Sequence, residues 1–342
     1  MAIEKKWSKE ERQKLAETVA SGASAGDFES LALEIFWYQF RFNPIYQKYV
    51  NLLNVNIKNV QSLWDIPFLP ISFFKHEQVR TGPVRPATTV FRSSGTTGQE
   101  PAQHFVPSLK GYTHNAVRGF CEAFSTALED VYFLALLPSY LERQDASLVH
   151  MAKAFTNRSQ PLPKHFFLDD FSSLARLLDR LVKEDKPIFL LGVTFALLEF
   201  AEKHPGHYEG LTVIETGGMK GRGPEWVRPE LHAKLRAKLR GANISSEYGM
   251  TELLSQAYWG EGYYRASRNM RVFPREITDP LARGPWEHKA ALNIIDLANI
   301  DSCAFIATSD LGRVQKGGRI FEVLGRLDQA EIRGCNLMYM PS

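Results

Sequence analysis

The chain has 342 residues, enough for roughly two domains or for one large α/β body with appendages. Its 41 lysines and arginines nearly balance its 38 aspartates and glutamates, and these charges form no basic block. Because phosphate backbones are held by clustered cations, the composition argues against nucleic acid as the main partner. An apolar fraction of 44% and a charged fraction of 23% exclude disorder on the scale of a domain.

Targeting and redox signals are sparse. The longest apolar stretch, residues 188–201, is shorter than the ~20 residues that a membrane-spanning helix needs. The amino terminus is charged from its fourth residue and lacks the apolar segment of a secretory signal. We therefore expect a cytoplasmic protein with no integral membrane segment. Cys121, Cys303 and Cys335 form no CxxC pair, so we expect free thiols rather than disulfides or a cysteine zinc site.

The first 60 residues favour helices. A capping box, Ser8-x-x-Glu11, predicts the start of one helix. A second apolar run, over residues 28–42, ends before an Asn-Pro pair that predicts its termination. We expect residues 1–84 to form a helical cap region that packs on the core.

From residue 85 onward, short β-rich runs alternate with helical stretches. We expect strands at 88–92, 131–137, 188–191, 211–215, 242–247 and 303–308, and helices at 109–128, 171–184 and 229–240. This alternation is typical of crossover connections and predicts an α/β fold with mostly parallel sheets over residues 85–324. The stretch 261–286, rich in Gly, Arg and Pro, is expected to be a long loop or a small subdomain.

A loop of small residues directly follows the first predicted strand. It consists of Ser93, Ser94, Gly95, Thr96, Thr97 and Gly98. Hydroxyls and backbone N–H groups of such a loop can converge on phosphate oxygens at the carboxyl end of a strand. The loop is not a Walker P-loop, because the GxxxxGK[ST] spacing is absent. By itself the loop fits a phosphate site and a solvated turn equally well.

Three further motifs follow this loop in order. They are Tyr248-Gly249-Met250-Thr251-Glu252, Thr308-Ser309-Asp310-Leu311-Gly312-Arg313 and Gly325-Arg326-Leu327-Asp328. The ordered set resembles the adenylate-forming (ANL) superfamily of acyl-CoA synthetases, adenylation domains and firefly-type luciferases. Within it, the chain is most similar to the LuxE-type acyl-protein synthetases over nearly its whole length. The phrases that carry this similarity are LPISFFK, FRSSGTTG, ETGGMKGR, EYGMTEL and GRLDQAEIRGCNLMYM.

The resemblance implies the fold of the large N-terminal domain of adenylate-forming enzymes. Since the chain stops soon after GRLD, we expect it to lack the usual mobile C-terminal domain. Residues 325–342 would then form a hinge-like tail.

The resemblance also implies ATP and Mg²⁺ as cofactors. The loop of residues 93–98 would hold the β- and γ-phosphates, Thr251 would contact the α-phosphate, and Glu252 would bind Mg²⁺, which prefers oxygen ligands. Taken without the resemblance, Thr251 and Glu252 also fit the start of a helix.

The same resemblance assigns the nucleoside. Tyr248, followed by Gly249, would offer an aromatic face to adenine, and Gly217 and Gly218 would form the opposite wall. Asp310 would accept hydrogen bonds from both ribose hydroxyls. From the residues alone, Tyr248 also fits a core aromatic and Asp310 a turn residue.

One departure from the superfamily concerns a lysine that most members carry just after the glycine-rich loop. This chain has Gln-Glu-Pro-Ala there, so another cation must meet the charge that develops on the α-phosphate. The candidates are Lys75, Lys220, Arg222 and Arg326. We rank Lys220 and Arg326 first because their segments border the expected nucleotide site.

Cys335 lies near the carboxy terminus, where LuxE-type proteins carry an acyl-accepting cysteine. The resemblance therefore implies that Cys335 takes the acyl group as a thioester, with Arg333 favouring the thiolate and Gly334 giving access. A passive thiol on a frayed end is the alternative.

The resemblance thus implies ATP-dependent activation of a carboxylic acid to acyl-AMP with release of pyrophosphate, followed by acyl transfer to Cys335. A fatty acid is implied by the family alone, and an acyl-accepting reductase or carrier protein is the implied partner. Two alternatives stay open: release of the acyl group to coenzyme A or a carrier thiol, and a nucleotide-binding module without catalysis.

Overall fold

The computed structural model describes residues 9–24, 26–82, 89–93, 100–138, 145–219 and 226–327. The chain divides into two compact units that interleave along the sequence. Unit 1 comprises residues 1–115, 251–255 and 263–342, and unit 2 comprises residues 116–250 and 256–262. The boundaries at residues 84 and 324 remain predictions.

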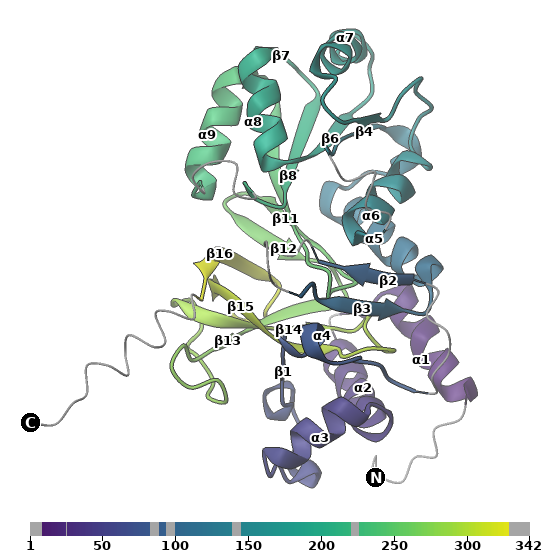
Figure 1. Ribbon diagram of the computed structural model, residues 1–342, viewed down its shortest axis with the longest axis vertical. Coiled ribbons are helices and arrows are strands. Elements are labelled where there is room, and N and C mark those ends of the chain that lie inside the picture. Colours follow the sequence, from purple (N-terminus) through teal and green to yellow (C-terminus); the bar gives the residue numbers. More distant parts are fainter. Residues whose placement is uncertain are drawn as a thin grey trace, which may run out of the picture. The chain divides into compact units, whose positions relative to one another are not determined.

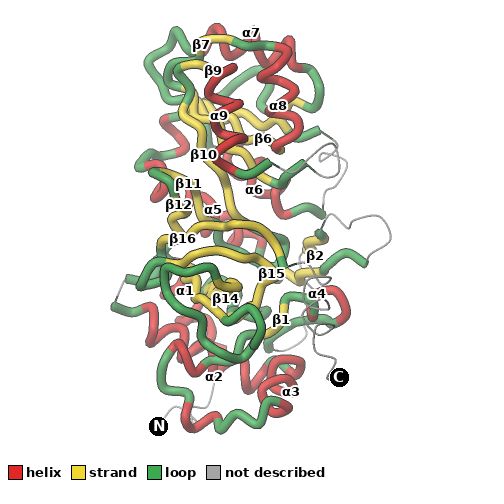
Figure 2. The backbone as a smooth tube through the Cα atoms, turned by 90° about the vertical axis from the view of Figure 1, so that its left-hand side faces the viewer, coloured by secondary structure: helices red, strands yellow, loops and turns green. Residues whose placement is uncertain are grey.

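Unit 1 contains antiparallel strands in the order β13 (Met270–Arg275), β14 (Ala290–Asp296), β15 (Phe305–Val314), β16 (Ile320–Arg326) and β12 (Tyr263–Ala266). A short strand, β1 (Leu69–Pro70), pairs in parallel with β15. A separate antiparallel pair joins β2 (Thr89–Arg92) to β3 (Gln103–Val106). Figure 2 shows β14, β15 and β16 as neighbouring strands of this unit.

The helices of unit 1 are α1 (Lys9–Ser21), α2 (Phe28–Phe42), α3 (Pro44–Leu52) and α4 (Phe73–His76), with 3₁₀ turns at Ile57–Asn59 and Leu63–Asp65. The helices expected in the first 60 residues are therefore present, although Ser8 of the expected capping box lies outside the described residues.

Asn43 separates α2 from α3. Its extended backbone ends α2, and its Oδ1 accepts a hydrogen bond from the Tyr46 backbone N–H at 2.9 Å, which caps α3. The rings of Phe36 and Tyr46 then pack on Phe305 of β15, with centroids 6.3 and 5.9 Å away. These contacts anchor α2 and α3 to the antiparallel strands.

Unit 2 contains parallel strands in the order β5 (Phe166–Phe167), β4 (Tyr132–Leu136), β6 (Ile188–Val193), β8 (Leu211–Thr216) and β10 (Asn243–Tyr248), with β11 (Ala257–Gly260) antiparallel to β10. A small parallel pair joins β7 (Gly206–His207) to β9 (Leu239–Arg240).

The helices of unit 2 are α6 (Ser147–Thr156), α7 (Phe171–Leu181), α8 (Thr194–Lys203) and α9 (Arg228–Lys238), besides the carboxyl-terminal part of α5 (Leu109–Phe124) and a 3₁₀ turn at Leu128–Asp130. In Figure 1, α8 and α9 lie on one side of the parallel strands and α5 and α6 on the other. This arrangement confirms the predicted crossover pattern of an α/β fold.

Aromatic packing fills the core of unit 2. The ring of Phe120 on α5 lies 5.6 Å from Phe133 of β4, 5.1 Å from Phe155 of α6 and 4.9 Å from Phe189 of β6. All six residues of β6 are buried, as expected for a strand covered on both faces. The continuous apolar runs of the sequence therefore mark this sheet correctly.

The antiparallel strands of unit 1 were not foreseen. The segment 261–286, expected to be a loop or small subdomain, contains β12 and β13. All six residues of β13 are buried, although they include Pro274 and two arginines, which conceal the strand in the sequence. The expected strand at 303–308 begins at Phe305 and extends to Val314, and it pairs antiparallel with β14 and β16 besides its parallel pairing with β1. Among the described residues, no helix is long and apolar enough to cross a membrane.

Gly312 of β15 allows close approach of β16. A Cβ added there would lie 2.0 Å from the Glu322 carbonyl oxygen and 3.0 Å from Leu292 Cδ1. We expect Gly312→Ala to lower the free energy of unfolding by about 1–3 kcal/mol, because neighbouring backbone must shift. Urea unfolding measures this loss. Gly260→Ala, where nothing lies within 4 Å, is the control, and an equal loss in both variants would contradict the steric argument.

Candidate functional site

The parallel strands of unit 2 end in polar residues at one edge of their sheet. Thr194 directly follows β6, Thr216 is the last residue of β8, and Tyr248 is the last residue of β10. Since β8 and β10 are neighbouring parallel strands, the chain segments after them start from the same edge. The predicted adenine residues, Tyr248 with Gly217 and Gly218, therefore lie at the ends of adjacent strands.

Backbone geometry explains the glycines of this group. Gly217 and Gly218 have φ values of 78° and 66°, in the left-handed region that favours glycine. A Cβ on Gly249 would lie 2.2 Å from Glu247 Oε1, so the carboxylate of Glu247 lies against this glycine. Tyr248 between them is 8% exposed.

Two carboxylates in this group have no role in the sequence analysis. Thr194 Oγ1 donates to Glu215 Oε2 at 2.9 Å, and Thr216 Oγ1 donates to Glu247 Oε2 at 2.5 Å. Burial raises the pKa of Glu247 to about 7, the hydrogen bond from Thr216 lowers it, and the nearby charge of Glu215 raises it further. The signal for both residues was an acid near the end of a buried strand, shortly before Gly-Gly or Tyr-Gly.

In unit 1, Asp310 and Arg326 lie opposite each other on two paired strands. They are register partners on β15 and β16, and Arg326 Nε donates to Asp310 Oδ1 at 3.2 Å. The side chain of Asp310 is 8% exposed and that of Arg326 is 75% exposed. Asp310 therefore lies within a strand rather than in a turn, beside a bulge at Leu311 and Gly312.

Glu252 is the buried acid of this second group. Burial raises its pKa to about 7, while the positive charges of Arg326 and Lys75 lower it and the negative charge of Asp310 raises it. Lys75 of α4, which the sequence analysis ranked below Arg326, thus acts electrostatically on the predicted metal ligand. The predicted residues Glu252, Asp310 and Arg326 belong to one electrostatic cluster.

Thr251 and Glu252 lie in a turn, not at the start of a helix. The Thr251 carbonyl oxygen accepts a hydrogen bond from His104 Nδ1 at 2.8 Å. Because a carbonyl only accepts, Nδ1 carries the ring proton. Burial lowers the pKa of His104 to about 4, so the ring is neutral. Nothing near His104 in the sequence pointed to this contact.

The predicted phosphate loop is described only at its first residue. Ser93 N donates to the Ala102 carbonyl oxygen at 3.1 Å, and Ser93 Oγ accepts from Ala102 N at 2.8 Å, which closes the pair of strands β2 and β3. Ser94, Gly95, Thr96, Thr97, Gly98, Lys220, Arg222 and Cys335 lie outside the described residues, and their roles stay predictions.

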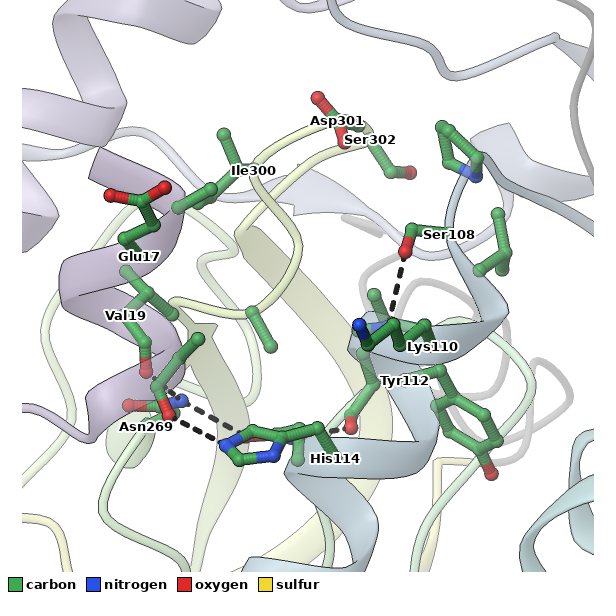
Figure 3. A pocket seen from close by; sticks show the side chains of 18 of the residues that line it. Glu17, Val19, Ser108, Lys110, Tyr112, His114, Asn269, Ile300, Asp301 and Ser302 are labelled. Atoms are coloured by element: carbon green, nitrogen blue, oxygen red, sulfur yellow. Dashed lines mark hydrogen bonds between the residues drawn. The ribbon is translucent and has the colours of Figure 1, made fainter. Parts of the chain in front are cut away.

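A cavity of about 440 Å³ lies within unit 1. Figure 3 shows Val19 of α1, Tyr112 of α5 and Ile300 among the side chains that line it. His104 and Leu254 also line this cavity, so it borders the segment that carries Thr251 and Glu252. No motif in the sequence indicated this cavity.

Glu252 is the carboxylate predicted to bind Mg²⁺. No group of three or more His, Cys, Asp or Glu residues is placed to hold a metal ion within the described part of the chain. Mg²⁺ bound to substrate phosphates needs only one or two protein carboxylates. Glu252 fits this need, because a divalent cation would stabilise the ionised form that burial disfavours.

Comparison with known proteins gave structural matches only. No family model and no curated protein sequence matches the chain. A 2-hydroxyisobutyryl-CoA ligase in the postadenylation state, in complex with 2-HIB-AMP, superimposes with a TM-score of 0.68 and 14% identity, over 95% of this chain and 73% of the ligase. The same ligase with 2-HIB-AMP and CoA in the thioesterification state gives 0.66 and 13%, over 96% and 73%.

A third structure, O-succinylbenzoate coenzyme A synthetase from Bacillus subtilis in complex with AMP, gives a TM-score of 0.50 and 17% identity, over 71% of this chain and 50% of the synthetase. The chain therefore has the α/β fold of the N-terminal domain of adenylate-forming enzymes, as the sequence predicted. Among its structural neighbours are ligases that form coenzyme A thioesters.

Glu247→Gln tests the buried carboxylate of unit 2. The folded pKa of about 7 exceeds the ordinary 4.5, so this group contributes stability below pH 4.5 that is lost as the pH rises through 7. We expect the variant to be more stable than wild type at pH 8 by roughly 1–3 kcal/mol, with the difference vanishing toward pH 4.5. Urea unfolding across this pH range measures the difference in the free energy of unfolding.

Glu230→Gln, at an exposed position of α9, controls for the lost charge. Parallel pH curves for wild type and Glu247→Gln would refute the assignment.

Proposed function

We propose that this protein uses ATP to convert a carboxylic acid to acyl-AMP, with release of pyrophosphate. The observation that carries the proposal is the cluster of Glu252, Asp310 and Arg326 in a chain that shares its fold with adenylate-forming ligases. These three residues belong to three separate motifs, each of which the sequence analysis had assigned to the nucleotide.

In this proposal, the nucleoside is bound by side chains with distinct chemistry. Tyr248 stacks on adenine, opposite the backbone of Gly217 and Gly218. Asp310 accepts hydrogen bonds from the ribose hydroxyls. Arg326 already donates to Oδ1 of Asp310, so it holds the carboxylate in one orientation.

The loop of residues 93–98 and Thr251 bind the phosphates. Glu252 binds Mg²⁺, which offsets the charge of the departing pyrophosphate when it is bound. Lys220 and Arg326 are the proposed cations for the α-phosphate. Lys75 is a third candidate, supported by its electrostatic effect on Glu252.

We further propose that the acyl group passes to Cys335. The Cys335 sulfur attacks the acyl carbonyl, the bond to the phosphate oxygen breaks, AMP leaves, and the thiol proton goes to solvent. Burial raises the pKa of Cys303 to about 12 and also raises that of Cys121, so both thiols resist becoming nucleophilic thiolates. Their environments leave Cys335 as the better acceptor within the chain.

A second candidate function is transfer to coenzyme A or to a carrier thiol. It is favoured by the fold shared with a ligase solved with both 2-HIB-AMP and CoA. The acid itself is proposed to be a fatty acid only through the LuxE-type resemblance, and a reductase or carrier protein would then receive the acyl group.

Pyrophosphate release with a panel of carboxylic acids tests the adenylation. We expect release that depends on ATP, Mg²⁺ and one class of acid, and a loss of about 10–100-fold in rate in Asp310→Asn and in Glu252→Gln. Asp279→Asn, an exposed carboxylate in a loop of unit 1, is the matched control and should retain the wild-type rate. Nucleotide binding without acid-dependent release would leave only a binding module.

Radiolabelled acid tests the acceptor. We expect label that stays on the denatured protein, is released by hydroxylamine, and is absent in Cys335→Ser. Cys121→Ser is the control and should keep the label, because its thiol is partly buried and its pKa is raised by burial. Equal acyl-CoA formation by wild type and Cys335→Ser would instead favour the second candidate function.

A further inference from the structure

The turn that carries Thr251 and Glu252 belongs to no helix or strand. Its backbone groups therefore lack the repeated partners that a helix or a sheet provides. Buried backbone N–H and C=O groups without partners are costly, so side chains that supply such partners favour one conformation of the segment. In this protein the partners come from distant parts of unit 1.

Asp296, the last residue of β14, binds the carboxyl-terminal side of the turn. Its Oδ2 accepts from Leu254 N at 2.8 Å and from Ser255 N at 3.0 Å, and its Oδ1 accepts from Ser255 Oγ at 2.6 Å. Asp296 is fully buried, and its backbone is fixed by pairing with Met270 of β13. One rigid carboxylate thus satisfies two consecutive backbone donors of the turn.

Asn299 binds the carbonyl of the proposed metal ligand itself. Its Nδ2 donates to the Glu252 carbonyl oxygen at 2.9 Å, and Asn299 is fully buried. The backbone N–H of Asn299 donates to the Asp296 carbonyl oxygen at 3.0 Å, so both side chains extend from one tight turn after β14.

Two further buried asparagines, Asn115 and Asn269, link the turn to α1 by hydrogen bonds. Asn115 Nδ2 donates to the Leu254 carbonyl oxygen at 2.6 Å and to Ser255 Oγ at 3.0 Å. Asn269 Nδ2 donates to Asn115 Oδ1 and to the Val19 carbonyl oxygen of α1, each at 2.9 Å. Figure 3 shows Asn269 directed toward α1 beside the cavity. The turn is thus linked by hydrogen bonds to β14, α5 and α1.

We propose that Asp296 and Asn299 are positioning residues that hold Glu252 where Mg²⁺ and the pyrophosphate leaving group require it. This inference rests on the proposed adenylation. Neither side chain needs to touch substrate. They act by fixing the backbone on both sides of Leu253, which sets the direction in which the Glu252 side chain leaves the chain.

Asn299→Ala and Asp296→Asn test the proposal. The first removes the donor to the Glu252 carbonyl oxygen, and the second replaces one acceptor oxygen of the carboxylate by an NH₂ group. We expect the Mg²⁺ concentration for half-maximal pyrophosphate release to rise about 10–100-fold, with kcat falling and KM for the acid nearly unchanged. We also expect faster amide hydrogen exchange at Leu254 and Ser255.

Asn293→Ala is the matched control. Asn293 lies on β14, the strand that ends in Asp296, and is buried. Its Oδ1 accepts from Arg275 Nε and not from the turn. The control should lose stability without a change in Mg²⁺ requirement. A purely structural role of Asp296 and Asn299 would give the same pattern as this control.

Each outcome decides between the hypotheses. Wild-type Mg²⁺ dependence and wild-type exchange in folded Asn299→Ala would overturn the positioning role. Should Asp296→Asn fail to fold, Asn299→Ala and Ser255→Ala decide in its place. If wild type itself releases no pyrophosphate with any acid, the proposed function fails, whereas hydrogen exchange at Leu254 and Ser255 still reports whether these side chains hold the turn.

Discussion

The proposed site of unit 1 depends on the burial of an ionisable carboxylate among other charges. Ionising Glu252 in a buried place is unfavourable, and Arg326 and Lys75 reduce that cost while Asp310 increases it. A group balanced in this way responds strongly to an added cation. In a core that serves only packing, an apolar residue would cost less free energy than a buried group of charges. The electrostatic cluster therefore supports the proposed binding of a ligand near Glu252.

Both regular strands and an irregular turn position the residues of the cluster. Asp310 and Arg326 lie on paired strands, so their contact is set by register. Glu252 lies on a turn, whose conformation depends on buried side chains such as Asp296 and Asn299. Placing a functional residue on a loop that a rigid scaffold supports is common in binding sites. In this protein the support consists of hydrogen bonds that one substitution can remove.

Features with a local signal were predictable from the sequence, and features made by long-range pairing were not. Continuous apolar runs marked β4, β6 and β8, whereas the roles of Asp310 and Glu252, which rest on the ordered motifs, stay predictions. The direction of β15 leaves no mark in a single segment, because period-2 patterns are the same in parallel and antiparallel strands. Likewise, the contact between His104 and Thr251 joins residues 147 positions apart, and neither neighbourhood indicates the other.

The choice between self-acylation and release to an external thiol depends on which thiol is reactive. A nucleophilic cysteine must reach the thiolate at neutral pH, and burial of Cys303, which raises its pKa to about 12, forbids this. Partial burial also raises the pKa of Cys121. Of the three cysteines, Cys335 is therefore the acceptor in the proposed self-acylation. If Cys335 is unreactive, the acyl group of the proposed acyl-AMP would pass to an external thiol, which is the second candidate function.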